Sequence, residues 1–367
     1  MTVAYLSDVT ARDGLYQYRP PAKGREAAPA VSIHNLAKSF PARRSFAEAI
    51  RYPLSRSRTM VIRGISFDVR EGELFGILGL NGAGKTTLLK MLATLIVPDS
   101  GTAGVAGHDV RNEAQAVREI AAMVTAEERS LNWRLSALEN LRLFAGLHRM
   151  RATDAFTRIG EALTSVGLSE SGNKLVGSYS SGMRQRLLLA RALLSSPRVL
   201  LMDEPTRSLD PLAAHEFRRM LRDVIVDAGG ATVVLATHNA EEAFTYCDRV
   251  AVIHQGRVAA LGSGRELAAR FAQNNYRIWT AAVDHPAFDA LLRRGVLRGV
   301  VRRASAVEGS NVECVIAGDD SVAAEVLRFL VEANVGVSRF ERAQLPLSSL
   351  IARIAAACDS DQDGVDA

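Results

Sequence analysis

The sequence has few cysteines and no long hydrophobic run, and both absences limit its class. Its 367 residues include only Cys247, Cys314 and Cys358, whose wide separation fits neither a metal site nor a disulfide framework. No run approaches the roughly 18 apolar residues of a membrane-spanning helix, and residues 1–29 lack the apolar centre of a secretion signal. We therefore expect reduced, structural cysteines and a chain that stays in the cytoplasm.

Lysine is also rare, so the positive charge comes almost wholly from arginine. A net charge of +5 fits an arginine-rich solvated surface or a contact with an anionic partner. Clusters such as Arg56-Ser57-Arg58 leave open an approach to lipid headgroups. We favour the solvated surface and expect no nucleic-acid partner. With 48% hydrophobic and 23% charged residues, the chain can fill the cores of two domains.

A loop between a predicted strand and a predicted helix matches the phosphate-binding pattern G-x-x-x-x-G-K-[ST]. Residues 79–86 read Gly-Leu-Asn-Gly-Ala-Gly-Lys-Thr, after the apolar run Leu74–Leu78 and before the helix-like stretch 87–92. The glycines let backbone N–H groups point at the phosphates, with the positive end of the helix dipole behind them. Lys85 can reach the β- and γ-phosphates and Thr86 can ligate Mg²⁺. The sequence thus predicts binding of a nucleoside triphosphate.

A second apolar run ends in two acidic residues. Residues 199–204, Val-Leu-Leu-Met-Asp-Glu, are typical of a buried strand. At the strand end, Asp203 can hold Mg²⁺, directly or through water, and Glu204 can polarise the water that attacks the γ-phosphate. Two solvated acids would be the structural alternative. The phosphate loop upstream and the sequence Pro-Thr-Arg-Ser-Leu-Asp at residues 205–210 favour the catalytic interpretation.

Two further segments complete the pattern. Residues 179–186, Tyr-Ser-Ser-Gly-Met-Arg-Gln-Arg, open a predicted helix whose N-terminus can form a second anion site, although serine is also a common helix cap. The predicted strand 231–237 ends immediately before His238. A lone histidine after a strand is often structural. Its position after the acidic pair favours a sensor of the γ-phosphate.

Together the four segments resemble the ATP-binding subunit of ABC transporters over residues 31–267. Residues 79–86 are similar to the Walker A loop, 179–183 to the family signature, 199–204 to Walker B, 208–210 to the D-loop and His238 to the switch histidine. The resemblance implies an α/β fold, a P-loop ABC-type nucleotide-binding domain with a mixed sheet core, an antiparallel β subdomain and a helical subdomain. It also implies ATP and Mg²⁺ as cofactors and a dimer that encloses two ATPs.

The resemblance also assigns site residues by position. Nucleotide contacts fall on Phe40, Gly79, Asn81, Gly82, Ala83, Gly84, Lys85, Thr86, Thr87, Ser180, Gly182 and Asp210. Catalytic roles fall on Glu204, His238 and Lys85, and Mg²⁺ ligation falls on Thr86, Asp203 and Glu127. Ser180 and the Gly182 backbone are expected to contact the γ-phosphate of the ATP bound by the partner subunit. An isolated monomer is therefore expected to hydrolyse ATP poorly.

The chain departs from the family pattern at the signature and at the Q-loop. The signature is commonly Leu-Ser-Gly-Gly-Gln, whereas residues 179–183 read Tyr-Ser-Ser-Gly-Met, as in exporters of the drug-resistance and polysaccharide type. The usual Q-loop glutamine falls at about Glu127. Its carboxylate can ligate Mg²⁺ but adds negative charge beside Asp203 and Glu204. A solvated loop, with the true contact one residue away, is the open alternative.

A third departure concerns the aromatic residue that stacks on adenine in this family. Phe40, on an early predicted strand, is the best match. An arginine-rich insertion at residues 41–60 separates it from the predicted strand 61–69. Tyr52 lies within this insertion and is the alternative stacking residue.

The motifs leave both ends of the chain outside the ATP-binding domain. We expect an unstructured tail at residues 1–30, the ATP-binding domain at 31–267 with its helical subdomain at about 111–185, a small α+β accessory domain at 268–357 and an unstructured acidic tail at 358–367. In the accessory domain, strands are predicted at 276–280, 312–316 and 336–340, with a helix at 321–332. The function of this domain is not indicated.

The family function implies partners outside this chain. The chain is expected to pair with a second copy or a related ATPase subunit and to drive a separate multi-spanning membrane subunit at the cytoplasmic face of the plasma membrane, with export favoured. Trp133 is either a contact with that subunit or a residue that packs the helical subdomain. A soluble ABC-type ATPase acting on ribosomes or nucleic acid is one alternative, although only one Walker A loop is present. A nucleotide-gated regulatory module is another, suggested by Glu127 and opposed by Glu204 and His238. The cargo is not encoded here.

Overall fold

The chain divides into two units, which we describe separately from a computed structural model. Residues 29–41, 58–125, 130–271, 275–304, 310–318, 320–342 and 347–363 are described. The first unit comprises residues 1–264 and the second residues 265–367. None of the helices in these described ranges is long and apolar enough to cross a membrane.

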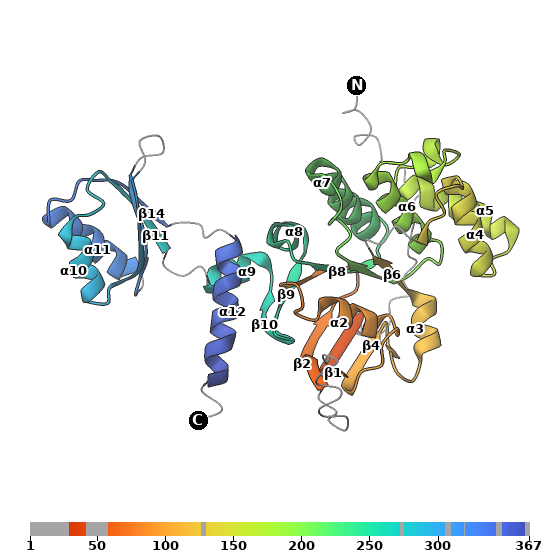
Figure 1. Ribbon diagram of the computed structural model, residues 1–367, viewed down its shortest axis with the longest axis horizontal. Coiled ribbons are helices and arrows are strands. Elements are labelled where there is room, and N and C mark those ends of the chain that lie inside the picture. The colour runs from red at the N-terminus through yellow and green to blue at the C-terminus, as the bar shows by residue number, and fades with distance from the viewer. Residues whose placement is uncertain are drawn as a thin grey trace, which may run out of the picture. The chain divides into compact units, whose positions relative to one another are not determined.

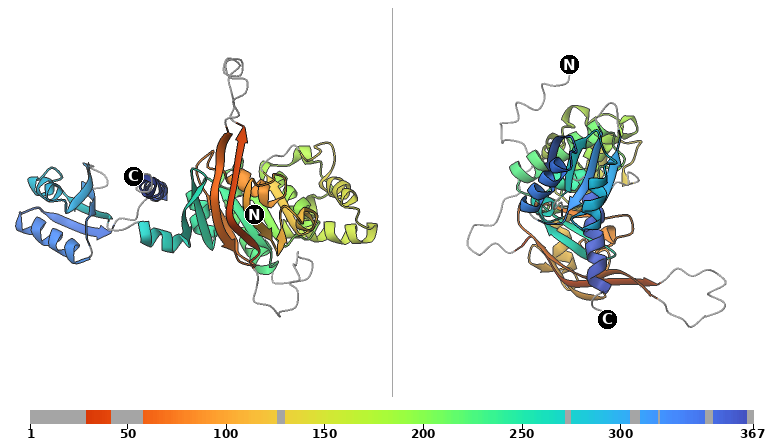
Figure 2. Two further views of the ribbon diagram at one scale, coloured as in Figure 1. Left: turned by 90° about the horizontal axis from the view of Figure 1, so that it is seen from below. Right: turned by 90° about the vertical axis from the view of Figure 1, so that its left-hand side faces the viewer.

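An antiparallel sheet forms one layer of the first unit. Its strands are β2 (Arg58–Val69), β1 (Val31–Pro41), β4 (Ser100–Val105) and β5 (His108–Asp109), in that order. The two long strands β1 and β2 run side by side in Figure 2, and their pairing continues to Pro41 opposite Arg58. The expected insertion at 41–60 therefore begins and ends in strand. Its residues 42–57, which include Tyr52, lie outside the described residues.

A six-stranded sheet forms the second layer and carries the motifs. Its order is β10 (Arg257–Gly262), β9 (Arg249–His254), β3 (Leu74–Leu78), β8 (Thr232–Thr237), β7 (Val199–Asp203) and β6 (Ala121–Thr125). All neighbours pair in parallel except β9 and β10. The strands β3 and β8 are buried at every position, as expected when helices or a second layer cover both faces of a parallel sheet.

Helices cover both faces of this sheet. Helix α2 (Lys85–Leu92) contacts β7 and β8 on one side and β2 and β4 of the antiparallel sheet on the other. Figure 1 shows α7 (Pro211–Met220) and α8 (Ala240–Tyr246) on the opposite face of the six-stranded sheet. After α7 the chain continues as the π-helical segment η4 (Leu221–Ala228). The phosphate loop, which opens α2, thus lies between the two sheets.

The remaining helices of the first unit follow the antiparallel sheet. They are α3 (Ala114–Ile120), α4 (Ala137–Leu147), α5 (Ala152–Ser165) and α6 (Ser181–Leu193), with short 3-10 turns at Ser169–Ser171 and Val176–Ser178. Ser136 and Glu139 form a capping box at the start of α4. Helices α4, α5 and α6 pack against one another and form the helical subdomain.

The second unit contains a four-stranded antiparallel sheet in the order β12 (Leu297–Arg303), β13 (Asn311–Ile316), β11 (Asn275–Thr280) and β14 (Val337–Arg342). Helices α10 (Pro286–Arg293) and α11 (Asp320–Glu332) pack on it around Ile278, Phe288 and Leu330. The predicted strands and helix are present with similar bounds, whereas β12 and α10 were not predicted. Helices α9 (Gly264–Phe271) and α12 (Leu347–Asp363) flank this body in sequence.

Two further predictions concern the acidic C-terminal stretch and the cysteines. Helix α12 extends to Asp363, so the acidic stretch expected to be unstructured begins within a helix. Cys247 and Cys314 are buried, and burial raises the pKa of both thiols, that of Cys314 to about 12. Both are free, buried thiols, which fits the expectation of reduced, structural cysteines.

Candidate functional site

The phosphate loop depends on glycine for its shape. Gly82 and Gly84 have φ angles of 83° and 103°, in the region that residues with a Cβ rarely adopt. At Gly84 a Cβ would also lie 2.6 Å from Cδ1 of Ile62 and 2.9 Å from the carbonyl oxygen of Val61, both in β2. The loop therefore packs directly against the β1–β2 hairpin, and α2 begins immediately after Gly84.

Lys85 is buried beneath this loop. Its Nζ donates hydrogen bonds to the carbonyl oxygens of Gly79 at 2.7 Å and Leu80 at 3.2 Å. Burial lowers the pKa of Lys85, and the nearby carboxylates of Glu204 and Asp203 oppose that shift. The ammonium group thus lies inside the loop, where an anionic phosphate would stabilise its charge.

The other loop residues are arranged around this centre. Asn81, Gly82 and Thr86 are exposed, Thr87 is half-buried, and Ala83 is buried. Residues 80–82 are exposed and accessible to a ligand, whereas Ala83 packs in the hydrophobic core. The loop therefore combines an accessible outer surface with a buried base.

Thr86 and Asp203 provide a pair of oxygen ligands. The Thr86 hydroxyl donates a hydrogen bond to Oδ1 of Asp203 at 3.2 Å. Burial raises the pKa of Asp203, although the Thr86 hydrogen bond opposes the shift. Within the described ranges, no group of three His, Cys, Asp or Glu side chains could hold a metal ion. A hydroxyl and a single carboxylate fit Mg²⁺, which takes few protein ligands and completes its shell with water and substrate phosphates.

Glu204 lies beside two cationic side chains and one histidine. Its Oε1 is 3.1 Å from Nδ1 of His238 and 3.7 Å from Nζ of Lys85, and its Oε2 is 3.5 Å from Nη1 of Arg207. Oε2 is buried and accepts no hydrogen bond. The backbone φ of Glu204 is 48°, an uncommon value for a residue with a side chain. Such local strain is often retained where it serves function.

The strand order explains why these residues meet. Strand β8 lies between β3, which leads to the phosphate loop, and β7, which leads to Asp203 and Glu204. In the parallel register Leu78 is opposite Thr237, and Asp203 is opposite Ala236. His238 follows β8 and therefore emerges between the two motifs. The structure brings together Lys85, Thr86, Asp203, Glu204 and His238, which the sequence places up to 153 positions apart (238 − 85).

A buried hydrogen bond between Thr206 and Glu242, here called the Thr206–Glu242 tie, was not predicted from the sequence. Glu242, in the first turn of α8, is fully buried and accepts a hydrogen bond from the Thr206 hydroxyl at 2.7 Å. Arg218 of α7 lies 3.3 Å from the same carboxylate oxygen. Thr206 follows Glu204 by two residues and Glu242 follows His238 by four. The tie therefore joins the segment that carries Glu204 to the segment that carries His238. An acidic residue in the first turn of a helix is common, so the sequence around Glu242 did not indicate its contact with Thr206.

The predicted signature residues lie on a different element. Ser180 caps α6 by accepting a hydrogen bond from the Met183 N–H, and Gly182 is buried near Cβ of Ala213. Within the described part of the chain, Ser180 forms no hydrogen bond or ion pair with the phosphate loop. Asp210 likewise caps α7, where its carboxylate accepts a hydrogen bond from the Ala213 N–H. Asp210 thus has a local structural role besides the predicted one.

The remaining candidates have different outcomes. Phe40 is half-buried on β1, opposite Thr59 of β2, in the hairpin whose β2 strand contacts Gly84. Glu127 lies outside the described residues, after a strand that ends with Thr125 beside Asp203. The Trp133 side chain is 52% exposed, and its ring centroid lies 5.3 Å from the Arg184 guanidinium. Trp133 is thus available at the surface of the helical subdomain.

Comparison with known proteins agrees with this geometry. The family described as ABC transporter matches residues 62–207. A daunorubicin resistance ATP-binding protein, DrrA3 of Streptomyces coeruleorubidus, is 43% identical over 206 residues, which are 56% of this chain and 64% of that protein, less than two thirds of its length. The Nod factor export ATP-binding protein I of Ralstonia nicotianae is 36% identical over 249 residues, 68% of this chain and 72% of that protein.

A solved structure supports the fold. That structure, of cbiO1 from Clostridium perfringens, part of the ABC transporter complex cbiONQ, aligns with a TM-score of 0.57 and 24% identity over 73% of this chain and 96% of that chain. At this identity the similarity shows the fold alone. The relatives, the family match and the arrangement of the phosphate loop and acidic strand agree with one another. The chain belongs to the ABC transporter family of ATP-binding proteins.

Proposed function

We propose that this chain is an ATP-hydrolysing subunit of an ABC exporter. The observation that carries the proposal is the position of Glu204, whose carboxylate lies 3.1 Å from His238 and 3.7 Å from Lys85 at the edge of the sheet that holds the phosphate loop. A general base must lie within reach of the water that it activates, near the γ-phosphate. Lys85 marks the phosphate position, so Glu204 lies beside the place where that water attacks.

The proposed reaction uses these side chains in separate roles. Lys85 and the loop amides bind the β- and γ-phosphates, and His238 contacts the γ-phosphate. The anionic phosphate competes with Glu204 for Lys85 and His238, which frees the carboxylate to accept a proton from the attacking water. Thr86 and Asp203 would hold Mg²⁺, which neutralises phosphate charge when bound. Glu127 is proposed as an additional oxygen ligand.

The position of the signature residues supports a dimer. Ser180 is exposed at the N-terminus of α6, a position suited to an anion. Because the phosphate loop of the same chain and Ser180, both among the described residues, do not contact each other, we propose that Ser180 contacts the ATP bound by a second ATPase subunit. Two subunits then enclose two ATPs, each between the phosphate loop of one chain and the signature of the other. ATP binding closes the dimer, and hydrolysis reopens it.

The membrane partner supplies transport. We propose a separate multi-spanning subunit that contacts the helical subdomain near Trp133, with this chain peripheral to the cytoplasmic face of the plasma membrane. The relatives are named for daunorubicin resistance and Nod factor export, which favours export over import. The cargo is left open, because specificity is expected to lie in the membrane subunit.

A pull-down from detergent-solubilised membranes tests the proposal. The tagged full chain is expected to recover a multi-spanning protein, and the eluted complex is expected to hydrolyse ATP faster than the chain alone. Recovery of ribosomes or DNA without a membrane protein would instead support an ATPase that acts on those partners. ATP binding without measurable hydrolysis in the complex would indicate a regulatory module.

The Thr206–Glu242 tie predicts a selective kinetic effect. Thr206→Val removes the hydroxyl with little change in volume, so the segments that hold Glu204 and His238 lose their shared hydrogen bond. We expect kcat of the complex to fall about 10-fold through misplacement of the base, with the dissociation constant for ATP unchanged. Thr206→Ser keeps the hydroxyl and is expected to restore the rate. A serine variant as slow as the valine variant would contradict this role for the hydrogen bond.

A further inference from the structure

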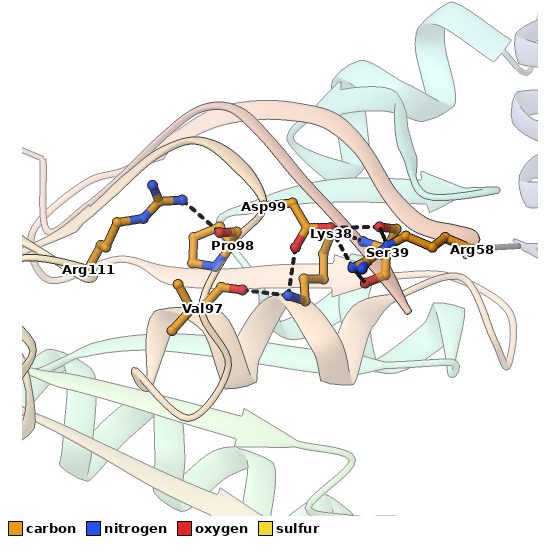
Figure 3. Close-up of polar contacts among 7 residues, drawn as sticks. All are labelled: Lys38, Ser39, Arg58, Val97, Pro98, Asp99 and Arg111. Atoms are coloured by element: carbon orange, nitrogen blue, oxygen red, sulfur yellow. Dashed lines mark hydrogen bonds and ion pairs between the residues drawn. The ribbon is translucent and has the colours of Figure 1, made fainter. Parts of the chain in front are cut away.

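Asp99 forms the centre of a polar cluster at the end of β1. Its Oδ2 accepts hydrogen bonds from the Ser39 N–H at 2.8 Å and the Ser39 hydroxyl at 2.7 Å. Its Oδ1 accepts a hydrogen bond from Nζ of Lys38 at 2.8 Å (Figure 3). These contacts hold the pKa of Asp99 well below its usual range, with the Lys38 hydrogen bond the largest cause. One carboxylate thus fixes both the backbone and the side chains of two successive residues of β1.

The cluster also includes the neighbouring strand. Arg58, the first residue of β2, donates from Nε to the Ser39 hydroxyl at 2.7 Å and from Nη2 to the Ser39 carbonyl oxygen at 3.0 Å. Both strands of the hairpin are therefore fastened at the same point. Figure 3 shows Arg58, Ser39 and Lys38 gathered around Asp99.

The loop that carries Asp99 is itself anchored. Lys38 Nζ donates to the carbonyl oxygen of Val97 at 2.7 Å, and Arg111 donates to that of Pro98 at 2.6 Å. The backbone N–H of Asp99 donates to the Ala37 carbonyl oxygen at 2.9 Å. This loop follows α2, whose first residue is Lys85 of the phosphate loop. The cluster therefore links the end of β1 to the helix that begins at the phosphate loop.

Phe40 is the residue immediately after this anchored pair. Nζ of Lys38, already held by Asp99, lies 5.5 Å from the centroid of the Phe40 ring, within the range of a cation–π contact. Phe40 pairs with Thr59, and further along β2 the residues Val61 and Ile62 contact Gly84. The Phe40 backbone is thus joined to the phosphate loop through β2, and its ring contacts the lysine that Asp99 holds.

We propose that Asp99 is a positioning residue that holds Phe40 at the distance from the phosphate loop required to stack on the base of ATP. This inference rests on the proposed function, because it takes ATP as the ligand and Phe40 as the stacking residue. Asp99 acts through Lys38 and Ser39 and does not itself touch the nucleotide. Its effect falls on the base and not on the triphosphate, which separates it from a general role in folding.

Binding of two ligands by the full chain tests this inference. The dissociation constants of Mg²⁺–ATP and of Mg²⁺–tripolyphosphate, which has no base, are measured by calorimetry. Stacking on an aromatic side chain contributes to the affinity for the base, so Asp99→Ala, which misplaces the ring, is expected to weaken ATP binding about 10-fold. Tripolyphosphate binding is expected to stay within about twofold, because Lys85 and the loop glycines are unchanged.

Two further variants complete the experiment. Glu113→Ala is the matched control, because Glu113 is also an exposed acceptor of backbone and side-chain hydrogen bonds but lies beside β5, with His108 and Asp109. It is expected to bind both ligands as the wild type does. In a Phe40→Ala background, Asp99→Ala is expected to cause no further loss of ATP affinity.

The outcomes separate the two proposals. Equal weakening of both ligands by Asp99→Ala, or unchanged ATP affinity, would overturn the positioning role. Further loss of ATP affinity in the Phe40→Ala background would also overturn it. Failure of the wild-type chain to bind ATP would overturn the proposed function itself. These results are distinguishable because the wild type serves as its own reference for both ligands.

Discussion

Replacement of Glu204 by glutamine is expected to lower kcat for ATP hydrolysis by about 100- to 10,000-fold, the usual contribution of a general base. Glutamine keeps the volume and one oxygen acceptor of the side chain but cannot take a proton from water. ATP binding should persist, because Lys85 and the loop amides are intact. The variant should therefore accumulate as an ATP-bound dimer that closes and does not reopen.

This result also depends on the environment of Glu204. Its carboxylate interacts with His238, Lys85 and Arg207, and its Oε2 is buried without a hydrogen bond. Removal of the negative charge leaves the cations of Lys85 and Arg207 to a bound phosphate alone, which favours nucleotide retention. The trapped state is thus expected to hold ATP more tightly than the wild type.

Size-exclusion chromatography with Mg²⁺–ATP, together with the hydrolysis rate of the membrane complex, measures both effects. Glu241→Gln is a matched control, because Glu241 is an exposed acid in the first turn of α8, beside the buried Glu242. It should hydrolyse ATP normally and form no stable dimer. Normal turnover by Glu204→Gln would show that another residue is the base.

Lys85→Ala is expected to weaken ATP binding by about 100-fold, since hydrogen bonds to charged groups each contribute about 1.5–3 kcal/mol and Lys85 is placed to reach two phosphates. The lost contact is with the ligand, so hydrolysis at ordinary ATP concentrations should fall with it. Burial disfavours the Lys85 charge, as its lowered pKa shows. Removal of that charge is therefore expected to leave the stability of the fold largely intact.

Calorimetric titration with ATP and a thermal melt separate binding from folding. Lys90→Ala is the control, since Lys90 lies in the last turn of the same helix and is only half-buried. Its ATP affinity should match that of the wild type. A melting temperature for Lys85→Ala many degrees below the wild type would mean that the hydrogen bonds to Gly79 and Leu80 hold the loop together. The loss of binding would then have a structural cause.

Local patterns in the sequence were sufficient for the motifs and for most elements. The phosphate loop was predictable because Gly82 and Gly84 adopt φ angles that strongly favour glycine, so the residue types follow from the backbone. The buried strands Leu74–Leu78 and Val199–Asp203 were predictable as short apolar runs. In the second unit, β12 was missed because four of its seven residues, Arg298, Gly299, Arg302 and Arg303, are charged or glycine.

Other features depended on side chains that meet only after folding. Nothing in the local sequence joins Thr206 to Glu242, Asp99 to Ser39, or Arg207 to Glu204, because each pattern on its own is typical of a turn, a cap or a solvated charge. The strand order β3-β8-β7 brings His238 between the phosphate loop and Glu204, and this order is a property of long-range pairing.

The sequence by itself therefore determined the family, the phosphate loop and the identity of the acidic pair, since these follow from residue types at fixed spacing. Only the tertiary structure decided which side chains surround Glu204, that its backbone is in the left-handed region, and that Asp99 joins the β1–β2 hairpin to the loop after α2. The physical reason is that spacing fixes local backbone geometry, whereas hydrogen bonds and ion pairs between distant segments depend on how the sheets and helices pack.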